Sequence, residues 1–345
     1  MSHRCLGSLA SLAVVVGMGS FAAVQLAAQT QKPTANAAAA SAPSKAIPRT
    51  AWGAPDLNGV WTGNIMTPME RSEANKNKEF LTPEEVAADE KRQAETALVD
   101  NAPAAGNPGT YNNIFMDPAF KGVPDHRTSL IVDPPNGRIP YTPEGQKIQA
   151  FIRAQRGNGP YNTAADLDTG ERCITDGIPI FNGGYNNNYQ IFQTRDYVAI
   201  LHEYYHEARI VPLDGRPHGD APQWLGDARG RWEGDTLIVD SVKFADKGQY
   251  LWAAAWRASR PTTHLIERFT RKADTIEYSF TLEDPTMYTQ PWTAKWPLSK
   301  QAAVGVTQGP LYEYACHEGN HAIVGVLKGG RALEKAQQGK KGTTN

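Results

Sequence analysis

From residue 189 to residue 297 the chain is a succession of short runs rich in Val, Ile, Tyr, Phe and Thr, separated by turn residues. This pattern constrains the fold most, because β-branched and aromatic runs favour strands and short turns favour antiparallel hairpins. Since no helix of crossover length separates the runs, a parallel doubly wound sheet is disfavoured. The runs are Tyr189 to Thr194, Tyr197 to Tyr205, Ala208 to Leu213, Thr236 to Phe244, Thr262 to Thr270, Thr275 to Leu282 and Trp292 to Pro297.

Strands at this spacing predict a mainly β fold, built as an antiparallel barrel or sandwich. Glu233-Gly234-Asp235 and Lys272-Ala273-Asp274 are suitable hairpin connections. The segment Asp56 to Trp61 also resembles the Gly-x-Trp opening of lipocalin-like barrels. A lipocalin-like barrel is therefore one form that the fold could take.

The N-terminal third, from Trp52 to Tyr161, is punctuated by Pro, Gly and Asn and is expected to be loop-rich and partly helical. Thr82 to Ala97 predicts a surface helix, since Thr82 can cap it and Pro83 suits its first position. A second helix is expected to begin at Thr142-Pro143-Glu144 and to place one apolar face against the core.

The beginning of the chain indicates export. Arg4 precedes an uncharged, largely apolar run from Leu9 to Ala28, which is the pattern of a signal peptide, with an uncleaved membrane anchor as the alternative. We therefore expect a signal peptide over residues 1–28, a flexible tether over 29–50, a single β-rich domain over 51–330 and a polar C-terminal tail over 331–345. The mature protein is expected to be periplasmic or secreted, with no membrane contact after signal cleavage.

Signal cleavage removes Cys5 and leaves Cys173 and Cys316 as the mature cysteines. Two cysteines outside the cytoplasm usually pair, so a disulfide is predicted. Cys316 as a thiolate ligand or nucleophile is the alternative, because His317 and Glu318 follow it.

The formal net charge of -1 leaves no basic field for phosphate backbones, so we expect no nucleic-acid partner. The sequence also lacks a GxSxG nucleophile elbow, a GxxxxGK[ST] loop and a GxGxxG fingerprint after a strand. Nucleotide use and ordinary serine hydrolysis are therefore unsupported. The expected partner is a small-molecule ligand or substrate.

His202-Glu203-Tyr204-Tyr205-His206 matches the HExxH pattern of zinc peptidases. On a helix, His202 and His206 could bind one divalent metal such as zinc while Glu203 activates its water. The alternating flanks favour a strand instead, in which Glu203 points away from both histidines. The segment is therefore predicted to be strand, with a zinc metallopeptidase kept as an alternative function.

A strand would place His202 and His206 on one face, and inward polar residues in a barrel indicate a pocket. Asp214-Gly215 then forms a turn that displays Arg216 and His218. Arg216 could grip an anionic group and His218 could act as acid or base. We predict that the catalytic residues His202, His206, Arg216 and His218 converge on one cavity. The alternative is that the side chains of His202 and His206, and the turn at Asp214-Gly215, face solvent instead.

Two further clusters carry titratable groups. His264 shares a strand with Glu267, but their alternation places them on opposite faces. The segment Tyr312 to His321 is dense in Tyr, Glu and His, and a Cys173–Cys316 bond would hold it beside Arg172. The competing interpretation of this segment is polar capping around a disulfide.

Five motifs occur in a fixed order: RTSLIVDPPNGR (127–138), ERC (171–173), DGRPH (214–218), GRWEGDTL (230–237) and EYACHEGN (313–320). Together they resemble a family of secreted bacterial proteins of unassigned function, over about residues 55–325. The resemblance implies one mature domain and makes the HExxH match incidental. It implies no activity or substrate.

The leading functional prediction is a periplasmic or secreted enzyme of acid–base type, a lyase or hydrolase acting on a small sugar-like or aromatic compound. Eight tryptophans and thirteen tyrosines supply rings that could line a pocket for such a compound. The alternative is a non-catalytic, lipocalin-like small-molecule-binding protein. Catalytic groups must converge in one pocket, whereas the same groups can be scattered in a binding protein.

Overall fold

A computed structural model describes residues 46–97, 121–155, 161–181, 186–246, 255–257, 259–300, 311, 313–318 and 320–341. The expected signal peptide and most of the expected tether lie outside these residues. Lys45–Asn345 form one compact unit. In the described parts of the chain, no helix is both long enough and apolar enough to cross a membrane.

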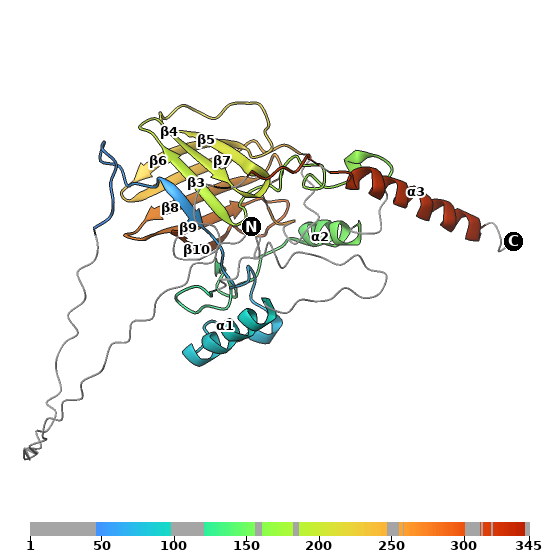
Figure 1. Ribbon diagram of the computed structural model, residues 1–345, viewed down its shortest axis with the longest axis horizontal. Helices are drawn as coiled ribbons and strands as arrows, with labels where there is room; N and C mark the ends of the chain where they lie inside the picture. Colours follow the sequence, from blue (N-terminus) through green and yellow to red (C-terminus); the bar gives the residue numbers. More distant parts are fainter. Residues whose placement is uncertain are drawn as a thin grey trace, which may run out of the picture. The chain divides into compact units, whose positions relative to one another are not determined.

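The core of this unit is one ten-stranded sheet in the order β5-β4-β3-β1-β10-β9-β8-β7-β6, with β2 also paired to β10 (Figure 1). All of these pairings are antiparallel, so the predicted mainly β, antiparallel fold is confirmed. The strands are β1 Gly59–Thr62, β2 Ile131–Asp133, β3 Asn188–Gln193, β4 Tyr197–His202, β5 Glu207–Pro212, β6 Asp227–Glu233, β7 Thr236–Val242, β8 His264–Arg271, β9 Thr275–Glu283 and β10 Trp292–Lys300.

The sheet curls into a barrel that is nearly closed where β5 approaches β6. Gly230 on β6 makes this approach possible because it has no side chain. A methyl group there would lie 2.5 Å from Leu213 Cδ2 and 2.7 Å from Val211 Cγ1. The barrel is therefore closed by packing at this seam.

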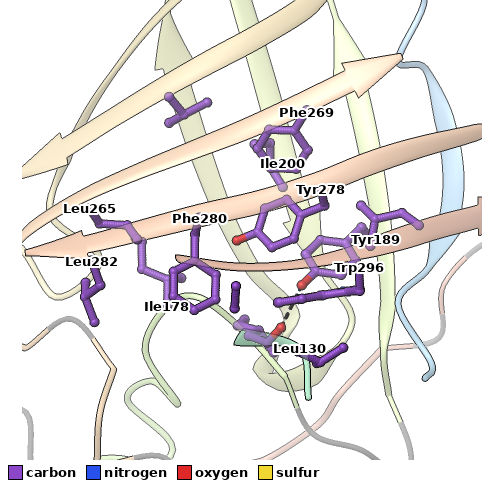
Figure 2. Close-up of a cluster of buried hydrophobic side chains, with 14 of the residues drawn as sticks. Leu130, Ile178, Tyr189, Ile200, Leu265, Phe269, Tyr278, Phe280, Leu282 and Trp296 are labelled. Carbon is purple, nitrogen blue, oxygen red and sulfur yellow. Dashed lines mark hydrogen bonds between the residues drawn. The ribbon is translucent and has the colours of Figure 1, made fainter. Parts of the chain in front are cut away.

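The inner face of the barrel is filled by aromatic and aliphatic side chains (Figure 2). Strands β8 and β9 alternate strictly between buried and partly exposed residues, as expected when one face packs on a core. Tyr278 and Trp296 are in contact there, with ring centroids 4.8 Å apart. Trp292 and Trp296 are fully buried among these rings, so they belong to the core.

The described residues also form three α-helices: α1 Pro83–Ala97, α2 Pro143–Gln155 and α3 Ala322–Lys341. The first two confirm the helices predicted from their caps. The third was not predicted, because Gly325, Gly329 and Gly330 lower its helix propensity. It continues through much of the segment expected to be a polar tail.

The predicted strand over His202–His206 is wrong. Strand β4 ends at His202, a short 3₁₀ turn, η4, covers Tyr204–His206, and β5 begins at Glu207. Tyr205 and His206 have φ of 61° and 53°, values that a strand does not allow. The alternating flanks are the two strands of one hairpin, with the HExxH motif at its turn.

The predicted disulfide is confirmed: Cys173 is bonded to Cys316 across a sequence separation of 143 residues. The Asn320 side-chain amide donates to the Glu171 carbonyl at 3.0 Å and contacts Cys173 Sγ at 3.1 Å. The pairing leaves no thiolate at Cys316 and fixes the segment around residue 316 against residues 171–173, as the sequence predicted.

Candidate functional site

The four residues predicted to share one cavity do not converge. His202 is only 3% exposed and faces the barrel interior, whereas His206 lies exposed at the hairpin turn. Arg216 is exposed in the next loop, and His218 lies on the outer face of the sheet. The prediction of a single His202, His206, Arg216 and His218 site is therefore wrong, because the turn at Tyr204–His206 and the loop after β5 separate the four side chains.

Arg216 lies over the opposite face of the sheet from His202. It donates to the Tyr197 hydroxyl at 3.1 Å, and its guanidinium is 5.9 Å from the Tyr197 ring centroid. Tyr197 is on the outer face of β4, where Val198, Ile200 and His202 point inward. Arg216 also pairs with Asp214, so its charge is already compensated at this turn.

His202 presents one ring nitrogen to the interior with no hydrogen-bond partner in the described parts of the chain. The Tyr204 amide donates to its Nδ1 at 3.1 Å, while the Tyr204 carbonyl is more distant at 3.4 Å. An Nδ1 that accepts a hydrogen bond leaves the ring proton on Nε2. Nε2 is buried and makes no hydrogen bond to any residue that the structure describes. The edge of the Tyr189 ring supports the imidazole, with centroids 4.5 Å apart.

Glu207 is the cross-strand partner of His202 at the same end of the barrel. The carboxyl is hydrogen-bonded by the Thr175 side chain, but its Oε2 is buried and has no hydrogen-bond partner among the described residues. Both side chains line a cavity of about 10 Å³, which is room for about one water molecule. The cavity is also lined by Ile178, Ile180, Tyr189, Ile200, Arg209, Leu225 and Glu267.

Burial shifts the two titrating groups in opposite directions, because desolvation disfavours the charged form of each. It lowers the pKa of His202 to about 3, and the cationic Arg257 and Arg209 contribute to this. It raises the pKa of Glu207 to about 7, with a further increase from Asp176. At neutral pH His202 is thus a neutral donor through Nε2, and Glu207 populates both its protonated and its ionised form.

A buried ion pair crosses the interior beside this cavity. Arg209 on β5 donates to Glu267 on β8 through both terminal guanidinium nitrogens, Nη1 and Nη2, with the Nη2 bond at 3.0 Å. The two side chains are 9% and 2% exposed. Tyr278 donates to the same carboxylate at 2.8 Å. The sequence contained a signal for this pair, since Arg209 alternates with Val211, and Glu267 lies between Leu265 and Phe269.

We define the outer-face chain as Asp227, His218, Asp240, His264 and Glu283, which lie on β6 to β9 and the preceding loop. His218 contacts Asp227 and Asp240, both at 3.2 Å. His264 contacts the other oxygen of Asp240 at 3.1 Å and Glu283 at 3.5 Å. The two imidazoles therefore share one carboxylate. His218 belongs to this chain and not to the His202 cavity.

The arrangement does not fit a zinc site at the HExxH motif, because His202 is inside the barrel and His206 is exposed at its turn. Among the described residues, no three His, Cys, Asp or Glu side chains are placed to hold one metal ion. The predicted metal ligands His202 and His206 therefore do not form a pair.

Comparison with protein-family models and with curated proteins gives no match for this chain. The functional assignment therefore rests on the geometry above.

Proposed function

We propose that this protein is a periplasmic or secreted β-barrel that binds a small sugar-like or aromatic molecule, with one polar group of the ligand held at the barrel end by His202 and Glu207. The observation that carries the proposal is a pair of buried polar atoms, His202 Nε2 and Glu207 Oε2, that lack hydrogen-bond partners among the described residues and belong to two residues lining the same cavity. Buried polar groups are normally satisfied, so two such atoms together favour a bound group. Because the catalytic candidates are scattered, binding is favoured over catalysis at the predicted four-residue site.

The hydrogen-bond donors and acceptors of His202 and Glu207 indicate which ligand group they would bind. Neutral His202 offers an N–H donor, and Glu207 can accept or donate according to its proton. A hydroxyl group both donates and accepts, so it satisfies both side chains at once. The cavity accommodates that group, and Ile178, Ile180 and Leu225 would have to move to admit the rest of the molecule.

The extracytoplasmic location rests on two observations. The disulfide is typical of an oxidising compartment, and the sequence begins with the pattern of a signal peptide. Expression of the full chain in a bacterial host, followed by fractionation and N-terminal sequencing, tests this part. A protein that stays in the cytoplasm with Met1 intact would contradict it.

Calorimetric titration of the mature protein with glucose and with phenol tests binding. His202→Phe and Glu207→Leu should each weaken binding of the recognised compound, because each removes one hydrogen-bond partner of the hydroxyl. His206→Asn is the matched control, since Asn tolerates the left-handed backbone of this exposed position. Equal binding by all three variants would contradict a site at the barrel end.

An acid–base lyase or hydrolase is the second candidate function, favoured by the burial of the Glu207 carboxyl in the cavity wall. Desolvation raises its pKa to about 7, so it can take and return a proton near neutral pH. Glu207 would be the proton-transferring group. Hydrolysis of p-nitrophenyl glucoside and p-nitrophenyl acetate is the assay. Glu207→Gln should then lower turnover by about 100-fold or more, with His206→Asn unchanged.

A further inference from the structure

A second cavity lies outside the barrel, between α1 and residues 121–128. It has a volume of about 280 Å³, far larger than the cavity at His202. Its lining comes from residues 66–68, 75–93 and 122–128 and includes Met66, Leu81, Val86, Val123 and His126. Three segments distant in sequence therefore meet around it.

Hydrogen bonds within the chain fix the walls of this cavity. The Met66 amide donates to the Lys121 carbonyl at 2.9 Å, and the Val123 amide donates to Thr67 Oγ1 at 3.0 Å. On the other side, the Leu81 amide donates to the His126 carbonyl at 2.8 Å. The cavity is thus preformed, which lowers the cost of ordering its walls on binding.

The start of α1 is also fixed next to the cavity. The Thr82 amide donates to Glu85 Oε2 at 2.9 Å, and the Glu85 amide contacts Thr82 Oγ1 at 3.3 Å. This reciprocal pair is a capping box. It holds Val86, on the first turns of the helix, in the apolar part of the lining.

The polar groups of the lining indicate the chemical class of the ligand. Asp89 pairs with Arg92, and Arg127 pairs with Asp125, so the ionic charges near the cavity are compensated. An uncharged molecule is therefore favoured over an ion, since an ion would lose hydration without gaining a free countercharge. Met66, Leu81, Val86 and Val123 supply the apolar surface.

His126 provides the hydrogen-bonding group. His126 lines the cavity, and its imidazole makes no hydrogen bond or ion pair within the described parts of the chain. The backbone φ of His126 is 61°. Non-glycine residues in the left-handed region often occur at functional sites. The backbone bonds of His126 to Val123 and Leu81 hold the ring at the cavity wall.

We propose that this cavity binds a small, uncharged, mainly apolar molecule that carries one hydroxyl group, with the hydroxyl bonded to His126. The ligand class is that of a simple phenol or naphthol. This site is independent of the barrel-end site, because the two cavities share no lining residue.

Fluorescence titration of the mature protein with 2-naphthol tests the proposal. Binding should saturate at one molecule per chain, and naphthalene-2-sulfonate should bind at least about tenfold more weakly because its charge has no free partner. Absence of saturable 2-naphthol binding would overturn the site, and tighter binding of the sulfonate would overturn the ligand class.

Four variants locate the binding. Gln93→Trp places a ring in the cavity mouth from an exposed position and should abolish binding, whereas Ala87→Trp, on the exposed side of α1, should leave it unchanged. His126→Asn should weaken 2-naphthol binding by about fivefold but leave naphthalene binding unchanged. Glu207→Gln should have no effect. Equal binding by Gln93→Trp and wild type, or loss in Glu207→Gln, would overturn the proposal.

Discussion

His202 and Glu207 face each other across the β4–β5 hairpin, and each carries one buried polar atom that has no hydrogen-bond partner within the described part of the chain. The five-residue HExxH motif contains only one of these groups. Glu207 becomes its partner because the chain reverses between them, at Tyr204–His206. Each of the two groups makes the free energy of unfolding depend on pH, and the two dependences have opposite signs.

Glu207 makes the fold less stable as pH rises. Its pKa is raised from 4.5 to about 7, so the folded state holds the proton more tightly than the unfolded state. Stability from this group is complete below about pH 4.5 and decreases through about pH 7, by at most about 3 kcal/mol. Glu207→Gln should therefore be more stable than wild type at pH 8 and equal to it at pH 4. Urea melts at both pH values measure this, with the exposed Glu95→Gln as control, and an unchanged pH slope would contradict it.

His202 acts in the other direction. Its pKa is lowered to about 3, so the unfolded state binds the proton first as pH falls below about 6.5. The fold should lose about 3 kcal/mol from this group by about pH 4.5. His202→Phe should flatten the acid limb of the stability profile, whereas His206→Asn should retain it. Identical acid limbs in wild type and His202→Phe would show that the histidine is not buried in the neutral form.

The buried Arg209–Glu267 pair should be strongly coupled. Arg209→Met leaves the Glu267 carboxylate uncompensated in the interior, which should cost about 3 to 5 kcal/mol of unfolding free energy. Adding Glu267→Gln to this variant should recover part of the loss. Arg231 and Glu233 form a matched exposed pair, 58% and 56% accessible, whose disruption should cost less than about 1 kcal/mol. Additive losses in the double variant would contradict the buried pair.

Replacing Gly230 and Gly329 by alanine should change the stability of the protein in opposite directions. Gly230→Ala would force Leu213 and Val211 away from β6 at the barrel seam and should destabilise the protein by about 1 to 3 kcal/mol. Gly329→Ala, on α3 with nothing within 4 Å, should stabilise that helix by up to about 1 kcal/mol. Thermal melts of both variants measure the difference. A neutral Gly230→Ala would show that the seam is not closely packed.

The disulfide should be complete in the exported protein. Thiol titration of the denatured, unreduced mature chain should find no free thiol, and two equivalents would refute the bond. A loop of 143 residues carries roughly 4 to 5 kcal/mol in the chain-entropy description, before native-state strain is subtracted. Cys316→Ala should therefore lower the unfolding free energy by a few kcal/mol at most.

The sequence by itself determined the class of the fold. Period-two alternation and turn residues predicted the antiparallel sheet, caps predicted α1 and α2, and the cysteine count predicted the Cys173–Cys316 bond. These features are local, or follow from counting, so no knowledge of distant contacts is needed. Strand β6 and helix α3 were missed because Arg229, Gly230 and the glycines of α3 weaken their local patterns, and packing overrides such propensities.

Only the tertiary structure decided which polar groups meet. The turn at Tyr204–His206 separates His202 from His206 and pairs it with Glu207, because two left-handed residues reverse the chain where the sequence pattern continued as a strand. Barrel closure brings Arg209 to Glu267 across 58 residues, while Asp240 joins His218 to His264 on the outer face. Alternation predicts which face a side chain occupies, but register, turn geometry and closure determine its partner, and these depend on contacts between residues far apart in the chain.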